Sequence, residues 1–524
     1  MLLVTRDLAR SLVRGLQAAS VGKIFGMPGG GPNLDMIGSA EEVAIDFVLT
    51  HGENAACMMA AGYGRLTGTP GVAVVTRGPG LTSAVNGLAQ ATLDRFPLVL
   101  ISDTVSHAQG RRVAHQRLDQ VGVAAPVTKW SGTLGIRDPE AVVNAAARLA
   151  MTAPAGAVHL AFDPTVPGDE VPDVPTPVVA DDAVLERVRR LCAAARRPVV
   201  IVGLDAARHA AGVRDSLESL SCPILVTYEA KGTIPESWPN YAGLFTGAAI
   251  ERPLLEQADL IIALGLDPVE PTPGPWSYRA PMVMLHSHPI DTAYFGEPEL
   301  LVGPYEDHLK DLVGSCHSEW PPHAGREARE RDVAALEYPA QGLSPHEVVR
   351  VTRQARGDAL LTVDAGAHML VVMPLWVTDD ADSVLISNGL ATMGFALPAA
   401  IGAALARPGR RVVCFVGDGG LGMVLAELET LARLRLDVTV VVLNDEALTL
   451  IRLKQQQDQG GDSAVGYGTM DFAAMARGMG VPGTTVNDAE SLRAALTAAE
   501  PGPCLVDARI DPSGYPHVLR VTRG

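Results

Sequence analysis

The sequence predicts an α/β fold with three doubly wound parallel sheets, one in each third of the 524-residue chain. Short runs of β-branched and other apolar residues alternate along the chain with segments of helical periodicity, which is the pattern of βαβ units. Two stretches without this alternation, 164–177 and 317–343, divide the chain into three blocks of similar size. We therefore expect domains at 1–165, 180–316 and 344–524.

The composition indicates a globular protein with a large buried core. Hydrophobic residues make up 47% of the chain and charged residues 19%. A net charge of −17 and an aromatic content of 4% argue against a nucleic-acid or anionic-membrane partner. The six cysteines lie far apart without any CxxC pair, which fits a reducing compartment. Since no apolar run approaches membrane-spanning length, we expect a cytoplasmic protein.

The expected elements follow one another in each block. The first 26 residues fit an amphipathic helix leading to a strand, and not a signal peptide, because Arg6, Asp7, Arg10 and Arg14 interrupt them. Further strands are expected at 72–76 and 97–101 in the first block, at 198–202, 223–226 and 260–264 in the second, and at 360–363, 384–387, 412–416, 438–443 and 504–508 in the third.

The two breaks differ in character. The segment 164–177 contains five prolines, which cannot sit in a helix or a central strand. The segment 317–343 is polar and rich in arginine and glutamate. It ends at Ser344-Pro345-His346-Glu347, which predicts a helix start with Ser344 as N-cap and Glu347 completing a capping box.

The segment from Arg411 to Asp445 is the most informative part of the chain. A buried strand leads into Gly417-Asp418-Gly419-Gly420, helical spacing follows over 424–436, and a second strand ends at Asn444-Asp445. Parallel strands place Asp418 and Asp445 at the same carboxyl edge of the sheet. Glycine N–H groups beside two carboxylates suit Mg²⁺ held through a diphosphate. The alternative is an ordinary βαβ unit whose aspartates only cap helices.

A Gly-Asp-Gly run followed by such a strand and an Asn-Asp pair is typical of thiamine-diphosphate enzymes. Essentially the whole chain resembles the acetolactate synthase and pyruvate oxidase group of that family, and most of all its catabolic, FAD-independent acetolactate synthases. The resemblance implies pyrimidine-binding, central and diphosphate-binding domains in that order, with thiamine diphosphate and Mg²⁺ as cofactors. It is carried by the runs 25–33, 51–68, 74–91, 115–119, 128–130, 228–233, 254–276 and 389–406, besides the Gly-Asp-Gly segment.

In the first block the resemblance implies that Glu53 is catalytic, because family members carry a glutamate ten residues before a sequence like that around Tyr63 and Arg65. Its carboxyl group would bind ring nitrogen N1′ of the cofactor and favour the imino form. Without the surrounding motif, a helix-surface glutamate is the better interpretation of Glu53. The resemblance also implies catalytic roles for Gln116 and Gln455.

The resemblance implies cofactor contacts in the first and third blocks. Met393 would support the bent cofactor, or be a plain core residue, and the carbonyl of Ala391 would accept from the cofactor's amino group. His368 would lie at the diphosphate, or be a surface histidine. The full set expected to bind the cofactor is Gly29, Gly30, Gly366, Ala367, His368, Ala391, Met393, Asp418, Gly419, Gly420, Asp445 and Leu448.

The metal ligands implied by the resemblance are Asp418, Asp445 and the backbone oxygen of Ala447. Most of the family has asparagine where Asp445 stands, and an aspartate there is typical of the catabolic acetolactate synthases. A second carboxylate still suits a hard cation. The central block has no GxGxxG turn, so we do not expect FAD, although a vestigial flavin stays open.

The resemblance implies a carboligase that decarboxylates a 2-oxo acid, with pyruvate the first candidate, and transfers the acyl-anion unit to a second carbonyl compound. Gly52 and the glycines at 29–31 leave few proton donors, which favours carboligation, although His115 could reach the centre. There are two alternatives. One is a 2-oxo-acid decarboxylase, which is a lyase, and the other is an acetyltransferase of the sulfoacetaldehyde acetyltransferase type. A non-catalytic homologue fits least, because Glu53, Asp418 and Asp445 are all present.

Arg77 and Lys454 depart from the family pattern, and Arg452 is a third cationic residue, near Lys454 in the sequence. Arg77, Arg452 and Lys454 either bind a carboxylate or phosphonate group on an unusual acceptor or belong to the solvated surface, the latter being favoured for Arg452. The family places each cofactor between two chains, so we expect a homodimer or homotetramer with sites at the dimer interface.

Overall fold

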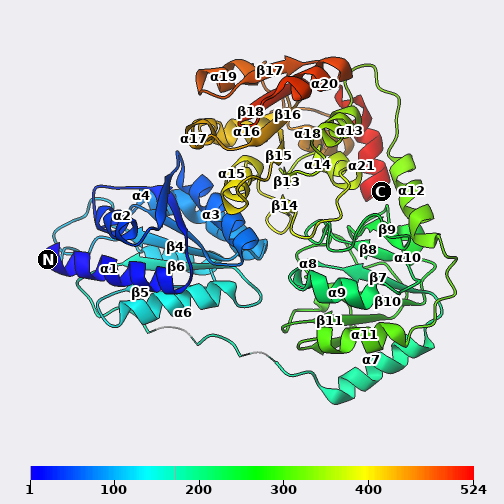
Figure 1. The fold of residues 1–524 in the computed structure, drawn as a ribbon, viewed down its shortest axis with the longest axis horizontal. Coiled ribbons are helices and arrows are strands. Elements are labelled where there is room, and N and C mark those ends of the chain that lie inside the picture. The colour runs from blue at the N-terminus through cyan, green and yellow to red at the C-terminus, as the bar shows by residue number, and fades with distance from the viewer. Residues whose placement is uncertain (1, 171–172, 177) are drawn as a thin grey trace.

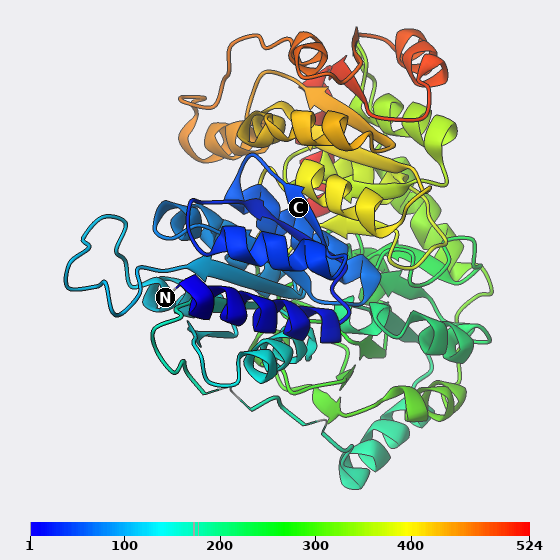
Figure 2. The same cartoon turned by 60° about the vertical axis from the view of Figure 1, so that its left-hand side comes forward.

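The computed structural model describes residues 2–170, 173–176 and 178–524. It contains three parallel six-stranded sheets, each formed by one continuous stretch of chain and flanked by helices (Figures 1 and 2). The predicted fold class is confirmed. The proline-rich break expected at 164–177 lies partly outside the described residues, since these omit Pro172 and Pro177.

The first sheet has the strand order β2-β1-β3-β4-β6-β5. Its strands are β1 (Lys23–Met27), β2 (Asp46–Leu49), β3 (Gly71–Val75), β4 (Leu98–Asp103), β5 (Trp130–Leu134) and β6 (Ala157–Phe162). The main helices around it are α1 (Leu2–Ala18), α2 (Asn33–Glu42), α3 (Glu53–Thr67), α4 (Pro79–Leu93), α5 (Gln120–Ala124) and α6 (Pro139–Met151).

The third sheet repeats this topology with the order β14-β13-β15-β16-β18-β17. Its strands are β13 (Leu360–Val363), β14 (Val384–Ile386), β15 (Val412–Gly417), β16 (Val438–Asn444), β17 (Gly483–Val486) and β18 (Cys504–Arg509). The helices named with it are α13 (Pro345–Arg356), α14 (Met369–Leu375), α15 (Ala396–Ala406), α16 (Asp418–Val424), α17 (Glu427–Leu434), α18 (Thr449–Gln459), α19 (Phe472–Gly478), α20 (Ala489–Ala498) and α21 (Tyr515–Arg523).

The central sheet has a different order, β12-β11-β10-β7-β8-β9, so its strand order reverses between β7 and β10. Its strands are β7 (Pro198–Val202), β8 (Ile224–Val226), β9 (Tyr241–Leu244), β10 (Leu260–Leu264), β11 (Met282–His286) and β12 (Glu299–Val302). Helices in this part of the chain are α7 (Asp182–Ala194), α8 (Leu204–Ala207), α9 (Ala210–Leu217), α10 (Arg252–Leu255), α11 (Glu306–Gly314) and α12 (Ala324–Ala335).

The first and third units pack against each other through α3 and α15, which share one apolar cluster. Small residues let these helices approach closely. A Cβ added to Gly402 would lie 2.3 Å from the backbone oxygen of Met59, and one on Gly62 would lie 3.6 Å from Cα of Ala399. The close contact fixes α3, and with it Glu53 at its first residue, against the third unit.

The structure adds strands that were not expected, namely β2, β5, β6, β9, β11, β12 and β17. It also differs from the expected elements at two places. The helix expected over 424–436 is broken, because α16 begins at Asp418 itself and α17 starts again at Glu427. The polar break at 317–343 contains α12, whose Arg329 guanidinium lies over the ring of Tyr241 on β9. The capping box is confirmed, since Ser344 Oγ accepts the backbone N–H of Glu347 at 3.1 Å.

The cysteines and the helix lengths bear on two of the expectations from the sequence. Within the described residues all six cysteines are free thiols, and five of them are buried. Among the described helices, none combines the length and the apolar character needed to cross a membrane.

Candidate active site

A cavity of about 270 Å³ lies at the carboxyl edge of the third sheet, where β13, β15 and β16 end. It gathers all the cofactor and metal residues predicted in the third block. These are Gly366, Ala367, His368, Ala391, Met393, Asp418, Gly419, Gly420, Asp445, Ala447 and Leu448. Asp418 and Asp445 lie together at this edge, as the parallel strands predict, whereas the other residues were expected from the family resemblance.

Asp418 is the first residue of α16 and is buried. Its Oδ1 accepts the N–H of Gly419 at 2.8 Å, and its Oδ2 accepts the N–H of Ala447 at 3.1 Å. Burial and the neighbouring Asp445 carboxylate raise the pKa of Asp418 to about 6. Each carboxylate oxygen keeps a free lone pair for a cation.

Asp445 follows β16 and is held by the start of α18. The Thr449 hydroxyl donates to Asp445 Oδ2, and Arg452 Nη2 donates to Thr449 Oγ1 at 3.1 Å. Burial raises the pKa of Asp445. Arg452 is partly exposed and lies near enough to Asp445 to oppose this rise in its pKa, and its role as acceptor-binding or solvated surface residue stays a prediction.

The two glycines after Asp418 leave no room for a side chain. A Cβ at Gly420 would lie 1.9 Å from Asp364 Oδ2, and one at Gly419 would lie 2.9 Å from Leu448 Cδ2 and 3.2 Å from Met393 Cε. Glycine at both positions therefore lets the side chains of Asp364, Leu448 and Met393 pack closely against the backbone of the cavity wall.

Asp364 organises the other wall and was not among the predicted site residues. It is fully buried and accepts the N–H groups of Gly394 at 3.0 Å, Phe395 at 2.8 Å and Ala396 at 3.3 Å. Burial raises the pKa of Asp364 to about 6. These bonds fix the start of α15 and the loop before it, from which Met393 reaches the cavity.

His368 lies in the cavity wall and only 4% of it is exposed, so the surface interpretation is wrong. Burial lowers the pKa of His368 to about 4, and the ring is therefore neutral at neutral pH. Its Nε2 is buried without a hydrogen-bond partner among the described residues. A buried ring nitrogen of this kind fits a ligand group in the cavity.

The donor set fits Mg²⁺ held through a diphosphate. Two carboxylates supply the hard oxygen ligands that this cation prefers, and the glycine turn and His368 suit phosphate oxygens. The cavity also has an apolar wall in Met393 and Leu448. One side of the cavity is therefore polar and the other apolar, which suits a cofactor with an anionic end and an apolar ring.

Glu53 belongs to a second group of residues, at the carboxyl edge of the first sheet. It begins α3, and a Cβ on Gly80 would lie 3.5 Å from Glu53 Oε1. Gly78 has φ +65°, and a Cβ added to it would lie 3.1 Å from Cβ of Gln116. We call these residues, together with Gly29 and Gly30, the pyrimidine half-site, and the residues around the cavity the diphosphate half-site.

The glycines at the end of β1 have different surroundings. A Cβ on Gly29 would lie 2.2 Å from Thr76 Oγ1, whereas the space around Gly30 is open among the described residues. Nearby, burial raises the pKa of Asp103 to about 7 although the Arg77 guanidinium opposes this. Arg77 thus lies with the pyrimidine half-site and Lys454 with the diphosphate half-site.

None of the predicted residues of the pyrimidine half-site lines the cavity. The two half-sites of one chain are linked at a different point, because the N–H groups of His51 and Gly52 donate to Glu427 Oε1 at 3.0 and 3.1 Å. Glu427 begins α17, so the third unit binds the N-terminal end of α3.

The helix α18 presents Lys454 to the cavity, and Gln455 is not among the lining residues. Gln455 Nε2 donates to Gln459 Oε1 at 3.4 Å along the same helix. The catalytic role of Gln455 stays a prediction. The C-terminal helix α21 adds Tyr515 and Arg523 to the cavity wall, and no sequence pattern predicts either residue there.

Comparison with known proteins bears on all three units. Residues 6–123, 185–295 and 364–508 match family models described as the thiamine pyrophosphate enzyme N-terminal TPP binding domain, central domain and C-terminal TPP binding domain. Acetolactate synthase from Bacillus subtilis is 31% identical, with 96% of this chain and 93% of the relative covered. The catabolic acetolactate synthase of Raoultella terrigena is 32% identical, with 95% and 94% covered.

A solved structure has the same fold. The thiamine diphosphate-dependent 4-hydroxybenzoylformate decarboxylase of Rhodococcus jostii superposes with a TM-score of 0.81, covering 96% of this chain and 99% of that one. The two sequences are 22% identical.

Proposed function

This chain belongs to the thiamine pyrophosphate enzyme family, and from that premise we propose that it is a Mg²⁺-dependent carboligase of the acetolactate synthase type. It would decarboxylate a 2-oxo acid, with pyruvate the first candidate, and transfer the acyl-anion unit to a second carbonyl compound. The observation that carries the proposal is the cavity in which Asp418 and Asp445 meet Met393 and His368.

We assign the metal to Asp418, Asp445 and the backbone oxygen of Ala447. The N–H of Ala447 already donates to Asp418, which holds this backbone segment beside the carboxylate. The diphosphate group would be bound by the N–H groups of the glycine turn and by the neutral ring of His368. Gly366, Ala367, Ala391 and Leu448 complete the cofactor contacts.

Bound thiamine diphosphate supplies a nucleophilic carbon that adds to the carbonyl group of the 2-oxo acid and stabilises the charge left after loss of CO₂. The role of Glu53 is to hold and move a proton at cofactor nitrogen N1′. Its position as first residue of α3, with glycines opposite, leaves the carboxylate accessible to a ring. Met393 would keep that ring positioned from the other side.

Carboligation is favoured over simple decarboxylation because few side chains near the reacting centre can donate a proton. Gly29, Gly30 and Gly52 line the pyrimidine half-site without polar side chains. His115 is exposed, next to Gln116. The second candidate is a 2-oxo-acid decarboxylase, which the fold shared with the 4-hydroxybenzoylformate decarboxylase allows.

We propose that two chains form each site. The predicted catalytic Glu53 and the metal ligands lie on different half-sites of one chain, so a neighbouring chain would supply the missing half. Large exposed apolar side chains beside the cavity support this arrangement, since Met423 is 60%, Ile451 50% and Tyr467 40% exposed. Apolar surface of this kind is typical of protein interfaces.

We do not expect FAD in the central unit. A dinucleotide pyrophosphate would lie at the N-terminus of the helix after β7, where the strand order reverses. Glu270 fills that place, because its carboxyl group accepts the N–H of Leu204 at 3.0 Å and that of Asp267 at 2.8 Å. The visible spectrum of the purified protein tests this, and a bound-flavin band would contradict it.

The deciding experiment is incubation with thiamine diphosphate, Mg²⁺ and pyruvate, with products identified by NMR. Acetolactate supports the carboligase proposal, whereas free acetaldehyde supports the decarboxylase. Absence of CO₂ release would mean that pyruvate is not the donor. Adding a second aldehyde or 2-oxo acid then reveals the acceptor, and Glu53→Gln serves as the control for protein-independent chemistry.

A further inference from the structure

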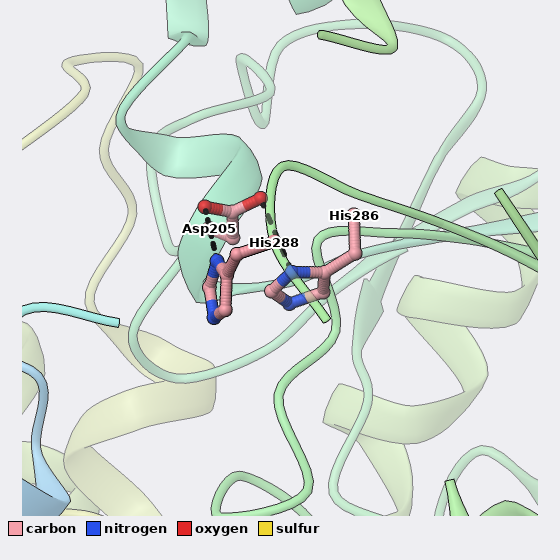
Figure 3. A group of neighbouring side chains, drawn as sticks. All are labelled: Asp205, His286 and His288. Atoms are coloured by element: carbon pink, nitrogen blue, oxygen red, sulfur yellow. Dashed lines mark ion pairs between the residues drawn. The ribbon is translucent and has the colours of Figure 1, made fainter. Parts of the chain in front are cut away.

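A second cluster of chemically reactive side chains lies in the central unit, away from the active-site cavity. It consists of Asp205, His286 and His288 (Figure 3). Asp205 belongs to α8, directly after β7, His286 is the last residue of β11, and His288 follows two residues later. The parallel sheet therefore brings all three to one carboxyl edge, and all three are buried.

Each histidine lies against a different oxygen of the Asp205 carboxylate (Figure 3). His286 Nδ1 is 3.6 Å from Asp205 Oδ2, and His288 Nδ1 is 3.9 Å from Asp205 Oδ1. The two imidazole rings are nearly perpendicular, with centroids 4.3 Å apart. One potential ligand atom from each residue lies within 4.8 Å of the other two.

The histidines lack the hydrogen bonds that buried imidazoles normally have. Within the described part of the chain, neither ring nitrogen of His286 has a hydrogen-bond partner, and Nε2 of His288 has none. Buried polar atoms in native proteins are nearly always satisfied by protein, water or an ion. Three unsatisfied ring nitrogens beside one carboxylate therefore indicate a ligand at this place.

Asp205 is held in position by the residue between the two histidines. Ser287 donates to Asp205 Oδ2 through its backbone N–H at 3.0 Å and to Oδ1 through its hydroxyl at 2.7 Å. Ser287 Oγ is also 3.1 Å from His288 Nδ1. Such bonds orient the ligands of metal sites and fix their tautomers.

We propose that Asp205, His286 and His288 bind one divalent transition-metal ion of the Zn²⁺ type, distinct from the Mg²⁺ of the active site. Two imidazoles and one carboxylate suit Zn²⁺ and its neighbours and do not suit Mg²⁺, which prefers oxygen ligands. Ligand atoms bound tetrahedrally at about 2.0–2.1 Å lie roughly 3.3–3.5 Å apart. The three side chains, whose ligand atoms lie within 4.8 Å of one another, would therefore have to move closer together when the ion binds.

The surroundings leave room for a fourth ligand, and one of the two neighbouring arginines is paired with a carboxylate. A cavity of about 10 Å³, enough for one water, is lined by Asp205, His288 and Arg95. The Arg95 guanidinium is paired with the Asp267 carboxylate at 2.9 and 3.2 Å, which neutralises it. A second cation, Arg208, donates to the backbone oxygen of Arg95 at 2.8 Å. The bound ion would tie the turn after β7 to the end of β11.

The test titrates Zn²⁺ into metal-stripped full-length protein by calorimetry, with thiamine diphosphate and excess Mg²⁺ present so that Asp418 and Asp445 are occupied. We expect one Zn²⁺ per chain and a higher Tm with Zn²⁺. The variants His288→Asn and Asp205→Asn should each lose at least about tenfold in affinity. The exposed His317→Asn should bind as the parent does.

A spectroscopic measurement on the unmodified protein does not depend on how the variants fold. Substituted Co²⁺ should give the intense visible bands of a tetrahedral site with nitrogen ligands. Absence of Zn²⁺ binding, unchanged binding in both variants, or only the weak spectrum of octahedral Co²⁺ would overturn the proposal. None of these outcomes bears on the carboligase proposal, because the Mg²⁺ site is filled throughout.

Discussion

The first and third units have the same strand order, yet their carboxyl edges carry complementary chemistry. In the third sheet, β15 runs directly into Asp418, and the loops around it hold two carboxylates and a glycine turn. In the first sheet, the equivalent strand β3 leads through Gly78 into α4 with no acidic residue at that turn. Its single predicted catalytic carboxylate, Glu53, stands on α3 instead.

The difference indicates that one topology has been divided between two tasks. The diphosphate half-site has buried carboxylates with raised pKa values and unsatisfied lone pairs, as a cation site requires. The pyrimidine half-site has glycines and one carboxylate, as a site for a flat ring and a proton requires. Under the proposed function neither half-site is complete alone, so changes to each should have different consequences.

The largest effect is expected from Asp418→Ala in the diphosphate half-site. The variant loses one metal ligand and leaves Asp445 as the only carboxylate at the site. Mg²⁺-dependent binding of thiamine diphosphate and all activity should therefore disappear. Calorimetric titration of the cofactor with Mg²⁺ measures this. The exposed Asp458→Ala on α18 is the matched control, and retained Mg²⁺-dependent binding in Asp418→Ala would refute the metal assignment.

Glu53→Gln should separate the two half-sites. The amide cannot exchange the proton, so kcat should fall by about 10²–10⁴-fold, whereas cofactor and Mg²⁺ affinity should change little. Steady-state kinetics and cofactor titration together check both statements. Exposed Glu41→Gln is expected to behave as the parent enzyme, and a Glu53→Gln enzyme with near-normal kcat would remove Glu53 from the mechanism.

Met393→Ala tests the positioning of the ring between the half-sites. Removing the side chain should lower kcat by roughly 10–100-fold through loss of alignment, while Met393→Leu keeps the apolar volume and most of the rate. Product formation from the 2-oxo acid is measured for both variants. Equal rates for the two would mean that Met393 serves only as packing.

The smallest effect concerns pH and belongs to the diphosphate half-site alone. The pKa of Asp418 is raised to about 6, so below that pH protons compete with Mg²⁺ for this carboxylate. Above that pH the carboxylate is ionised and available to the cation. Apparent Mg²⁺ affinity should therefore be constant near neutrality and weaken by about tenfold per pH unit below pH 6. Titrations from pH 5 to 8 would show this, and a flat profile would contradict it.

The residues predictable from the sequence were those fixed by local geometry. The Gly-Asp-Gly run, Asp445 and the Ser344 capping box follow from strand ends and helix starts that a single segment determines. Glu53 needed the family resemblance, because a glutamate at a helix start has no distinctive pattern of its own.

The missed residues depend on contacts between distant segments. Tyr515 and Arg523 reach the cavity only because α21 packs beside it, about a hundred residues after Asp418 in the chain. Asp364 could have been found, since it follows a predicted strand at the same carboxyl edge. Thr449 stands four residues after Asp445, but no sequence pattern predicts that its hydroxyl binds that carboxylate.

The central claim, that two chains complete each site, is tested most directly by mixing Glu53→Gln with Asp418→Ala under conditions that exchange subunits. Each variant alone is expected to be inactive. A mixed dimer would have one site with both changes and one intact site, so an equal mixture should recover about a quarter of the parent activity.

Mass spectrometry of the intact complexes must establish that mixed dimers form. Recovered activity that grows with their fraction is the predicted result. Mixed dimers without activity would contradict the account, because they would mean that Glu53 acts with Asp418 of its own chain.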